Sequence, residues 1–318
     1  MKAAIINDFG ELPQYKDFPD PVVNEGETLV HVRASVLENF DKGTAKGTHY
    51  SSKKLFPQFP AIVGTDGIGV TEDGRTVGFG NMKPPYGAFA EKAAAGYIVP
   101  APVDIDPAKV AAIPPSVLAS LLPLKYSAKL LHGETVLING AIGVSGRIAI
   151  QVAKMLGAGK VIGTGRNEQS LGLLTQLGAD IIIDLKQPED RLQKVFERES
   201  RNIDVVIDFL WGHPAEILIN TFIPNEAGFA KRNIRYIQIG EMAGSHISLP
   251  GSALRTSGLQ MMGVGKVPME TLFEEVENVY NLIRTDKFYM DIERVPLSEI
   301  ASAWQQTDTA GKRIVIVP

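Results

Sequence analysis

The sequence predicts an α/β protein in which a doubly wound, six-stranded parallel sheet accompanies a smaller β-rich region. Three observations favour this class. From about residue 135 short apolar strands alternate with helical segments, the first hundred residues are dense in Gly and Pro, and a glycine-rich loop follows the first of those strands. Strands that alternate with helices pair in parallel, whereas closely spaced turn residues indicate short strands joined directly.

The first hundred residues are predicted to form a compact β structure. The segment 29–34 alternates apolar and polar residues, which is typical of a half-buried strand. Beyond it the chain is divided by turn-forming residues, and no helical repeat is visible. These residues are Gly64, Gly67, Gly69, Gly74, Gly78, Gly80, Pro84, Pro85 and Gly87.

The second region carries the parallel sheet. Apolar residues between its first two strands recur at helical spacing over 148–156 and stop at Gly157, and leucines over 171–177 do the same before Gly178. Right-handed crossovers through such helices build a doubly wound sheet. The six predicted strands are Thr135–Asn139, Lys160–Thr164, Ile181–Asp184, Ile203–Asp208, Ile234–Ile239 and Leu259–Gly263.

The C-terminal tail is expected to rejoin the first region, because the two flank the sheet region in the sequence. An amphipathic helix is predicted over 269–283, and an apolar strand over 313–317. The predicted domains are therefore residues 1–115 with 266–318, and residues 116–265.

Composition excludes several classes of function. The formal net charge is −4 and basic residues are scattered, so neither a nucleic acid nor a membrane surface is an expected partner. The chain has no cysteine, which removes disulfides, thiolate nucleophiles and thiolate metal sites. We see no signal-like segment and no run approaching roughly 20 apolar residues, so a cytoplasmic location is expected.

A glycine-rich loop lies where a dinucleotide fold needs one, directly after the first strand of the sheet. Ala141 takes the first loop position, Gly143 permits close approach of a pyrophosphate, and Gly146 permits close helix–strand packing. The free N–H groups of the following helix then face the phosphates. The predicted phosphate-binding residues are Ala141, Ile142, Gly143, Val144, Ser145 and Gly146.

The end of the second strand predicts which dinucleotide binds. An NAD site places an acid here to hold the ribose hydroxyls, but residues 163–167 contain none. Gly165 leaves space for a 2′-phosphate, Arg166 offers a charged fork, and Thr164 offers a hydroxyl. Together with Asn167, these residues predict NADPH as the cofactor.

Short motifs follow one another along nearly the whole chain: Met1–Ala3, Gly64–Gly69, Gly74–Gly80, Gly87–Glu91, Ala111–Pro114 and Gly133–Leu137. In this order they resemble the medium-chain dehydrogenase/reductase superfamily, in its zinc-free quinone oxidoreductase-like branch. The resemblance implies a GroES-like substrate domain and a Rossmann domain, with nicotinamide and substrate held in the cleft between them. It also implies a homodimer joined through the last sheet strand, near 259–263.

Zinc-dependent members of that superfamily carry a catalytic Cys and a Gly-His-Glu motif. At the matching positions this chain has Glu38 and Thr65, and the four-Cys structural lobe is absent. The five histidines show no ligand-like pairing. No metal is therefore expected.

Without a metal to polarise a carbonyl, hydride transfer needs an acceptor that is already electrophilic. Quinones and enone-type double bonds meet this need, so the expected partner is a small electrophilic substrate. The protein would supply orientation, water exclusion and a hydrogen-bond donor. The candidate catalytic residues are Tyr50, Asn39 and Glu38, in or near the segment 38–41 that resembles the superfamily's substrate pocket.

Later segments resemble those that contact the nicotinamide half in relatives. Apart from 116–121, they follow the fourth, fifth and sixth sheet strands, at the strand ends where this fold binds ligands. Trp211 is expected either to shape the substrate site or to anchor the following helix. The residues are Leu210, Trp211, Ile239, Gly240, Gly263 and Val264.

Two other functions stay open at this point. One is an NADP-dependent alcohol or aldehyde oxidoreductase in which Glu38 or Tyr50 replaces zinc. The other is a non-catalytic NADPH-binding protein with a sensing or structural role, since a fold does not determine an activity.

Overall fold

The computed structural model describes residues 1–224, 228–230, 232–306 and 311–318. The chain divides into two compact units. Unit 1 comprises residues 1–115 and 272–318, and unit 2 comprises residues 116–271. The division drawn from the sequence places the second boundary at 265/266, whereas the chain returns to unit 1 inside helix α9, Met269–Arg284.

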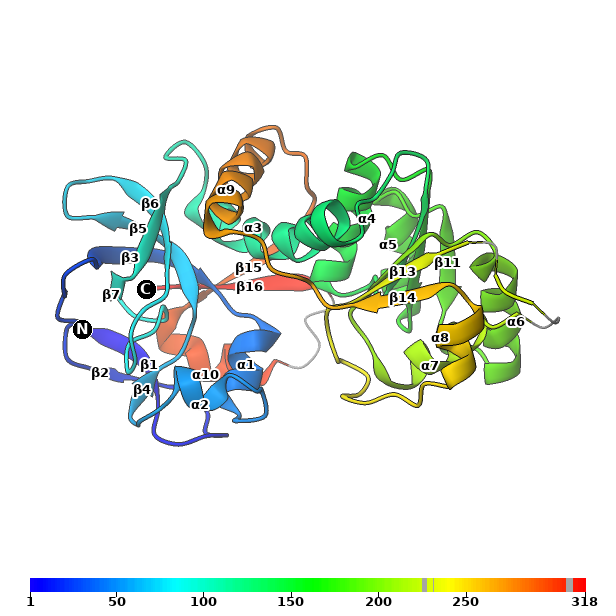
Figure 1. Ribbon diagram of the computed structural model, residues 1–318. Coiled ribbons are helices and arrows are strands. Elements are labelled where there is room, and N and C mark those ends of the chain that lie inside the picture. Colours follow the sequence, from blue (N-terminus) through cyan, green and yellow to red (C-terminus); the bar gives the residue numbers. More distant parts are fainter. Residues whose placement is uncertain (225–227, 231, 307–310) are drawn as a thin grey trace. The chain divides into compact units, whose positions relative to one another are not determined.

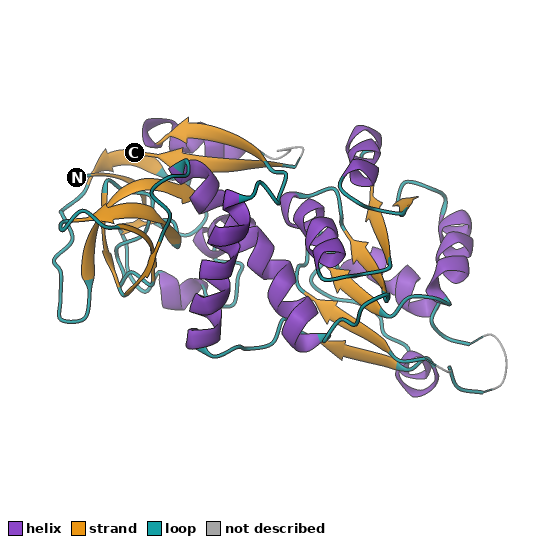
Figure 2. Cartoon of the chain, turned by 90° about the horizontal axis from the view of Figure 1, so that it is seen from above, coloured by secondary structure: helices purple, strands orange, loops and turns teal. Residues whose placement is uncertain are grey.

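Unit 2 contains a six-stranded sheet in the order β11-β10-β9-β12-β13-β14, and every adjacent pair is parallel. The chain runs from β9 outward to β11 and then returns to the other side of β9 at β12. Figures 1 and 2 show helices on both sides of this sheet. The strands are β9 (Thr135–Asn139), β10 (Lys160–Gly165), β11 (Ile181–Asp184), β12 (Val205–Asp208), β13 (Ile234–Gln238) and β14 (Leu259–Met262).

The predicted doubly wound class is confirmed, and the largest difference in a strand bound is the start of β12, at 205 instead of 203. One helix of unit 2, α8, has no counterpart in the sequence prediction. Its six residues make fewer than two turns, so no helical period develops. The helices are α4 (Val144–Met155), α5 (Glu168–Gln176), α6 (Glu189–Ser200), α7 (Gly212–Asn220) and α8 (Gly251–Thr256).

Unit 1 is built on a sheet in the order β15-β16-β3-β5-β6-β8, with β7 also paired to β3, and on a small sheet in the order β2-β1-β4. All pairs are antiparallel except β15 with β16. The strands are β1 (Lys2–Ile6), β2 (Gln14–Asp17), β3 (Thr28–Val36), β4 (Ala61–Ile62), β5 (Asp66–Thr71), β6 (Thr76–Gly80), β7 (Lys92–Ala95), β8 (Tyr97–Pro100), β15 (Asp291–Pro296) and β16 (Lys312–Val317).

The expectation of β structure without helices in the first hundred residues is wrong at two places. Helix α1 (Asn39–Ala45) and helix α2 (Ser52–Leu55) interrupt the strands. Both are too short for a periodic apolar face, which is why the pattern alone does not reveal them. Helix α10 (Ile300–Gln305) of the tail is equally short.

Helix α3 (Pro107–Leu122) contains the boundary between the units and continues as a π-helical turn, Pro123–Ser127. The segment 107–127 is long and apolar enough to cross a membrane by length and composition alone, with a mean hydropathy of 1.3. This corrects the expectation that no such stretch occurs. In the structure 67% of the apolar window is buried in the protein, as in a core helix.

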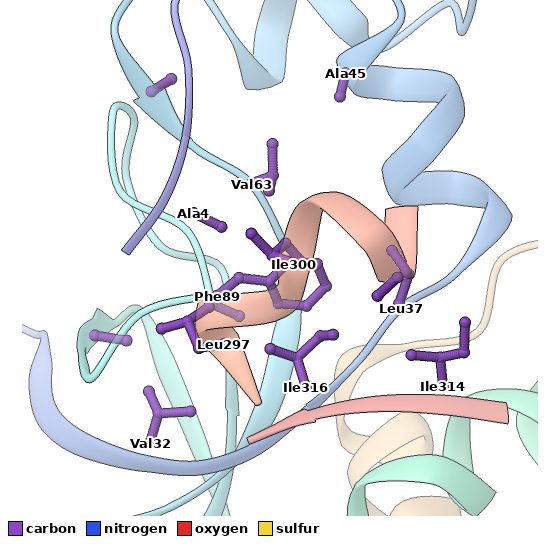
Figure 3. Close-up of a cluster of buried hydrophobic side chains, with 14 of the residues drawn as sticks. Ala4, Val32, Leu37, Ala45, Val63, Phe89, Leu297, Ile300, Ile314 and Ile316 are labelled. Carbon is purple, nitrogen blue, oxygen red and sulfur yellow. The ribbon is translucent and has the colours of Figure 1, made fainter. Parts of the chain in front are cut away.

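The core of unit 1 is assembled from distant parts of the sequence (Figure 3). Val32 of β3 and Phe89 lie in one buried cluster with Ile300 of α10 and Ile316 of β16. The terminal strand also pairs with β3, where Val315 lies opposite Val36. The C-terminal tail therefore completes the hydrophobic core that the N-terminal residues begin.

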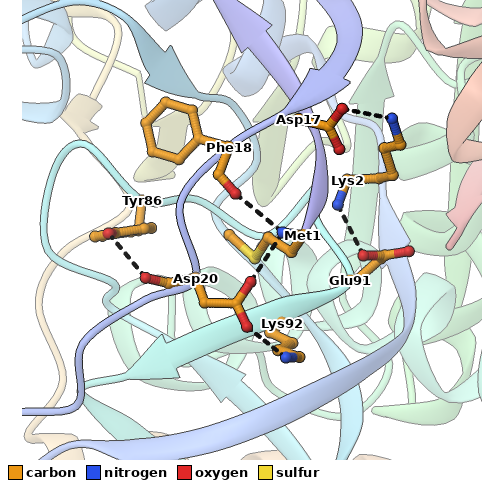
Figure 4. A network of polar contacts seen from close by, with 8 residues as sticks. All are labelled: Met1, Lys2, Asp17, Phe18, Asp20, Tyr86, Glu91 and Lys92. Atoms are coloured by element: carbon orange, nitrogen blue, oxygen red, sulfur yellow. Dashed lines mark hydrogen bonds and ion pairs between the residues drawn. The ribbon is translucent and has the colours of Figure 1, made fainter.

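Strand β1 is held to its neighbours by polar contacts (Figure 4). The Met1 amine donates to Asp20 Oδ1 at 2.8 Å, and Lys92 Nζ lies 2.5 Å from Asp20 Oδ2. The Lys92 hydrogen bond, followed by the Met1 amine, lowers the pKa of Asp20 to about 2. The Lys2 backbone N–H also donates to Glu91 Oε2 at 2.7 Å. These contacts link β1 to the segment that leads into β7.

Candidate functional site

The phosphate loop of unit 2 occupies residues 140–146, between β9 and α4. A Cβ atom on Gly146 would lie 2.3 Å from the Gly140 carbonyl oxygen, so only glycine lets the helix start this close to the strand. A Cβ on Gly143 would meet one atom within 4 Å, at 3.9 Å, so the outer side of the loop is open. Gly143 caps α4 without a side chain, which leaves the first N–H groups of the helix free of intrahelical acceptors.

Ala141 and Ile142 differ in where they face. Ala141 is fully buried, and its N–H donates to the Thr164 carbonyl at 2.8 Å. Ile142 is half-buried and packs against the end of β10, where its Cγ2 would lie 2.3 Å from a Cβ on Gly165. The lack of a side chain at Gly165 therefore makes room for Ile142 at the end of β10.

Thr164, which the sequence assigns to the 2′-phosphate, takes part in a hydrogen-bond network inside unit 2. Its side chain is fully buried. The Thr164 hydroxyl accepts from the Gly140 N–H at 3.0 Å and donates to Asn139 Oδ1 at 2.8 Å. The hydroxyl of Thr164 therefore donates and accepts inside the unit, and it fixes the first residue of the phosphate loop.

The two residues that follow β10 lie closer to solvent. Arg166 is exposed at the strand end. Asn167 caps α5, and its Oδ1 accepts from the Ser170 N–H at 3.1 Å. Of the residues expected to recognise a 2′-phosphate, Arg166 is the one with a positive charge, and its side chain is exposed.

A buried carboxylate, Asp208, lies at the end of β12. Its Oδ1 accepts from Asn139 Nδ2 at 2.9 Å and from the N–H groups of Leu210 and Trp211 at 2.8 and 3.1 Å, and its Oδ2 accepts from the Tyr236 hydroxyl at 2.5 Å. Burial raises the pKa of Asp208, against the effect of these donors. The sequence pointed to Leu210 and Trp211 but assigned no role to Asn139 and Tyr236.

The residues expected to contact the nicotinamide follow β12 and β13, and the two segments pack against each other. Trp211 adopts φ +55° and its ring contacts Tyr236 edge-on, with 6.3 Å between the ring centroids. Its half-buried side chain packs on the hydrophobic core of unit 2, which favours the anchoring role. Ile239 N–H donates to the Asp208 carbonyl at 2.8 Å, and a Cβ on Gly240 would lie 2.6 Å from the Phe209 carbonyl oxygen.

The remaining residues of this expected set lie after β14. Gly263 and Val264 are exposed. The Val264 carbonyl accepts from the Ser127 hydroxyl at 2.7 Å, which ties this segment to the end of the π-helical turn.

In unit 1 the three candidate catalytic residues have different surroundings. Glu38 precedes α1, and its Oε1 lies 3.1 Å from an Arg313 guanidinium nitrogen. Asn39 is exposed at the first position of α1. Tyr50 is 95% exposed, and its ring packs on His49 with 4.1 Å between centroids.

Glu38 belongs to a cluster of acids that the sequence did not group. Asp41 is buried, and its carboxylate accepts from the Glu38 N–H at 2.9 Å and from the Thr65 hydroxyl at 3.2 Å. Burial, and then the Glu38 carboxylate, raise the pKa of Asp41 well above its ordinary value. The same two causes raise the pKa of the half-buried Asp66 to about 7, although Arg313 opposes them.

Tyr97 extends this cluster across the sheet. Asp66, Gly80 and Tyr97 lie opposite one another on β5, β6 and β8. A Cβ on Gly80 would lie 2.5 Å from the Tyr97 hydroxyl, so the ring crosses β6 towards β5. Burial, followed by the Asp66 carboxylate, raises the pKa of Tyr97 to about 12. The register between the strands brings these residues together. The sequence pattern of one strand does not reveal this proximity.

Within the described ranges, no group of three His, Asp or Glu side chains is arranged to hold a metal ion. Thr65, at the position of a zinc ligand in zinc-dependent relatives, donates its hydroxyl to Asp41. Glu38, at the other such position, pairs with Arg313. The positive charge beside Glu38 is therefore the guanidinium group of Arg313.

Several known proteins are similar to this chain in sequence. Residues 145–217 match the family model described as zinc-binding dehydrogenase. A probable NADPH-dependent quinone reductase of Emericella nidulans is 29% identical over 226 residues, which cover 67% of this chain and 62% of that protein. A quinone oxidoreductase of Sus scrofa is 28% identical over 259 residues, 78% of this chain and 74% of that protein. An alcohol dehydrogenase of Geobacillus stearothermophilus is 29% identical over 221 residues, 58% and 63% of the two chains.

The aligned regions span less than two thirds of the length of the Emericella and Geobacillus proteins. Solved structures align over the whole chain. The quinone oxidoreductase of Thermus thermophilus, whose NADPH complex is known, is 25% identical with a TM-score of 0.80, and 100% of both chains is covered. The Escherichia coli quinone oxidoreductase in complex with NADPH is 19% identical with a TM-score of 0.82, again over 100% of both chains, and at that identity it supports the fold alone.

The motif order, the two-unit architecture and these relatives agree with one another. The family match covers α4 to α7, the part of unit 2 that follows the phosphate loop. The relatives extend the likeness to most of the chain. In sequence and fold the chain is similar to quinone oxidoreductases of the medium-chain dehydrogenase/reductase superfamily.

Proposed function

We propose that this chain is an NADPH-dependent oxidoreductase that works without a metal and passes a hydride to a quinone or to an activated carbon–carbon double bond. The observation that carries the proposal is the open phosphate loop beside an exposed arginine. Gly143 leaves the N-terminus of α4 accessible, Gly146 lets the helix start close to β9, and Arg166 follows β10 at a strand end with no acid. These residues fit a dinucleotide that bears a 2′-phosphate.

The names of the relatives support the same cofactor and acceptor class. The Emericella relative is described as NADPH-dependent and the Sus scrofa relative as a quinone oxidoreductase. NADPH complexes of the Thermus and Escherichia coli enzymes have the same fold as this chain.

When bound, NADPH supplies the hydride, and the protein supplies binding and orientation. The N-terminus of α4 holds the pyrophosphate through backbone N–H groups. Arg166 pairs with the 2′-phosphate as a charged fork. Leu210, Trp211, Ile239 and Gly240 line the strand ends where the nicotinamide half is received. Glu38, Asn39 and Tyr50 of unit 1 are the residues assigned to the electrophilic substrate.

The test is consumption of NADPH, with NADH in parallel, against a panel of quinones and enones. Arg166→Ala is expected to weaken NADPH binding by about 1.5–3 kcal/mol, the range for a hydrogen bond to a charged group, and to leave NADH nearly unchanged. Arg191→Ala, an exposed arginine on α6, is the matched control. Equal losses for the two cofactors would disprove the 2′-phosphate assignment.

The metal-free part of the proposal rests on the residues at the zinc-ligand positions. Glu38 pairs with Arg313 and Thr65 donates to Asp41, so neither side chain is arranged as a free ligand. Dialysis against a strong chelator should leave NADPH turnover intact. A loss that added zinc restores would contradict it.

A second function, oxidation of an alcohol or reduction of an aldehyde with NADP, is favoured by one observation. The Geobacillus relative is named alcohol dehydrogenase and has the same identity of 29% as the Emericella reductase, over 58% of this chain instead of 67%. Turnover of NADP⁺ with a panel of alcohols, and none of NADPH with quinones, would support this function. Tight NADPH binding without any turnover would support a non-catalytic sensor.

The proposal includes a homodimer and a cytoplasmic location. Strand β14 is at the edge of the six-stranded sheet of unit 2. An edge strand offers unpaired N–H and C=O groups to a second copy. Light scattering should give twice the chain mass of 34.4 kDa.

A further inference from the structure

The strand order of unit 2 reverses between β9 and β12, and ligands of doubly wound sheets bind beyond the C-terminal ends of the strands at such a reversal. Asn139 and Asp208 end these two strands and lie opposite each other in register. Asn139 Nδ2 donates to Asp208 Oδ1 at 2.9 Å, and both side chains are fully buried. A buried hydrogen bond therefore joins the two strands at the point of reversal.

This bond continues into the phosphate loop. Thr164 accepts from the Gly140 N–H and therefore donates to Asn139 Oδ1. That contact turns the amide of Asn139 so that its NH₂ group faces Asp208. A chain of hydrogen bonds thus runs from the first residue of the loop to the carboxylate at the end of β12.

Asp208 also holds the strained turn that follows β12. Its Oδ1 also accepts from the N–H groups of Leu210 and Trp211. Trp211 has φ +55° and Gly212 has φ +57°, and a tryptophan rarely adopts such a backbone conformation without support from its surroundings. The turn is also packed on the loop, because the Leu210 side chain would lie 2.9 Å from a Cβ on Gly140.

A second segment is bound to the same turn. The Ala243 N–H donates to the Leu210 carbonyl at 2.7 Å, after β13. From β13 itself the Tyr236 hydroxyl donates to Asp208 Oδ2. Side chains of β9 and β13 therefore meet at the carboxylate that ends β12, next to the point where the strand order reverses.

We propose that Asp208 is a positioning residue for the nicotinamide half of the cofactor, because its carboxylate holds the 209–212 turn in its strained form against the phosphate loop. The proposal rests on the function proposed above. A surface formed before the ligand arrives binds it without first having to be ordered. Loss of the carboxylate should therefore weaken NADPH more than a ligand that fills only the adenosine half.

The experiment compares dissociation constants for NADPH and for 2′,5′-ADP, which lacks the nicotinamide half, by calorimetry. Asp208→Ala is expected to raise the NADPH constant about tenfold and to leave that of 2′,5′-ADP within about threefold. Asp208→Asn keeps one oxygen for the three N–H groups, and the Tyr236 hydroxyl can accept from its NH₂. It should therefore recover most of the NADPH affinity.

Asp204→Ala is the matched control. Asp204 precedes β12 at its opposite end, where it accepts from the Thr135 N–H at 2.9 Å and pairs with Arg232. Its loss should destabilise unit 2 without changing the ratio of the two constants. In a Trp304→Phe background, the emission of Trp211 should also shift to longer wavelength in Asp208→Ala and stay unchanged in Asp204→Ala.

An unchanged ratio in Asp208→Ala, or an equal change in Asp204→Ala, overturns the proposal. If Asp208→Ala does not fold, Asp208→Asn decides: a ratio raised about twofold or more supports the positioning role, and an unchanged ratio overturns it. Failure of the wild-type chain to bind either ligand would instead overturn the proposed function, and the positioning role with it.

Discussion

Both units bury carboxylates close to the residues assigned to ligand binding, but they surround them differently. In unit 2 Asp208 accepts four hydrogen bonds, from Asn139, Leu210, Trp211 and Tyr236. In unit 1 Asp41 and Asp66 lie near a third acid, Glu38, which raises the pKa of both. Burial disfavours the charged form in both places, and the neighbours decide how far that effect is opposed.

The difference teaches that burial alone does not set the role of an acid. Every partner of Asp208 donates a hydrogen bond, so the network suits an anion that organises the backbone around it. Asp66 has a pKa of about 7 and carries a proton in a substantial fraction of molecules at neutral pH. One cluster is expected to act as a fixed scaffold and the other as a titrating group. Four substitutions test this contrast.

The largest effect is expected from Asp208→Ala, which leaves four donors without their acceptor. The free energy of unfolding of unit 2 should fall by about 3–5 kcal/mol, as when one partner of a buried charged network is removed. Each unit contains one of the two tryptophans, Trp211 in unit 2 and Trp304 in unit 1. Urea unfolding in a Trp304→Phe background therefore reports unit 2 alone. A loss below about 1 kcal/mol would contradict the scaffold role.

The second effect is a pH dependence of unit 1. The pKa of Asp66 is raised in the folded state, so the folded chain binds more protons than the unfolded chain between about pH 4 and about pH 7. Stability should therefore be greatest at the acid end of this window and fall as the pH rises through it. Raising a pKa from 3.8 to about 7 corresponds to about 4 kcal/mol, which solvent screening of the partly exposed carboxylate reduces to about 2 kcal/mol. Urea unfolding in a Trp211→Phe background measures it, and Asp66→Asn should flatten the curve. An equally steep curve in Asp66→Asn would assign the dependence to another group.

A smaller effect is expected from Tyr236→Phe, which removes one of the four donors to Asp208. Stability of unit 2 should fall by about 1 kcal/mol, the usual contribution of a hydrogen bond. Tyr280→Phe in unit 1 is the control, because the Tyr280 hydroxyl packs over Gly78, 2.4 Å from the position of a Cβ there. Equal losses in the two variants would show that the bond to Asp208 adds nothing specific.

The smallest effect is expected from Asp41→Asn, and its sign should be opposite. An amide can keep the bond from the Glu38 N–H and donate to the Thr65 hydroxyl, while it removes one acid from the cluster. Stability of unit 1 at neutral pH should rise by about 0.5–1 kcal/mol. A fall in the stability of unit 1 would instead show that the two clusters do not differ as described.

The parallel sheet was predictable because its elements carry their own local patterns. A buried strand such as Thr135–Asn139 has an apolar run at its centre, 136–138, and apolar residues of the helix after it recur every three to four positions. The loop glycines were predictable for the same reason, since a strand, a tight turn and a helix follow one another within 140–146. Short helices such as α1 and α8 were not, because they contain too few residues to show a period.

Site residues divide in the same way. Arg166 was found from its place after a strand, and it lies exposed there. Thr164 and Gly165 were assigned to a phosphate because they neighbour Arg166 in sequence. In the structure one is turned into the sheet and the other makes room for Ile142. Adjacent residues of a strand point to opposite faces, and sequence position alone does not say which face meets the ligand.

The sequence by itself determined the class of fold, the phosphate loop and the absence of cysteine ligands, since these depend on composition and on local patterns along the chain. Only the tertiary structure decided which polar groups meet. Asn139, Asp208 and Tyr236 lie on three strands and share one carboxylate. Glu38 and Arg313 come from opposite ends of the chain and form one ion pair. Contacts of this kind depend on strand register and chain return, which arise from packing of the whole unit and leave no local pattern.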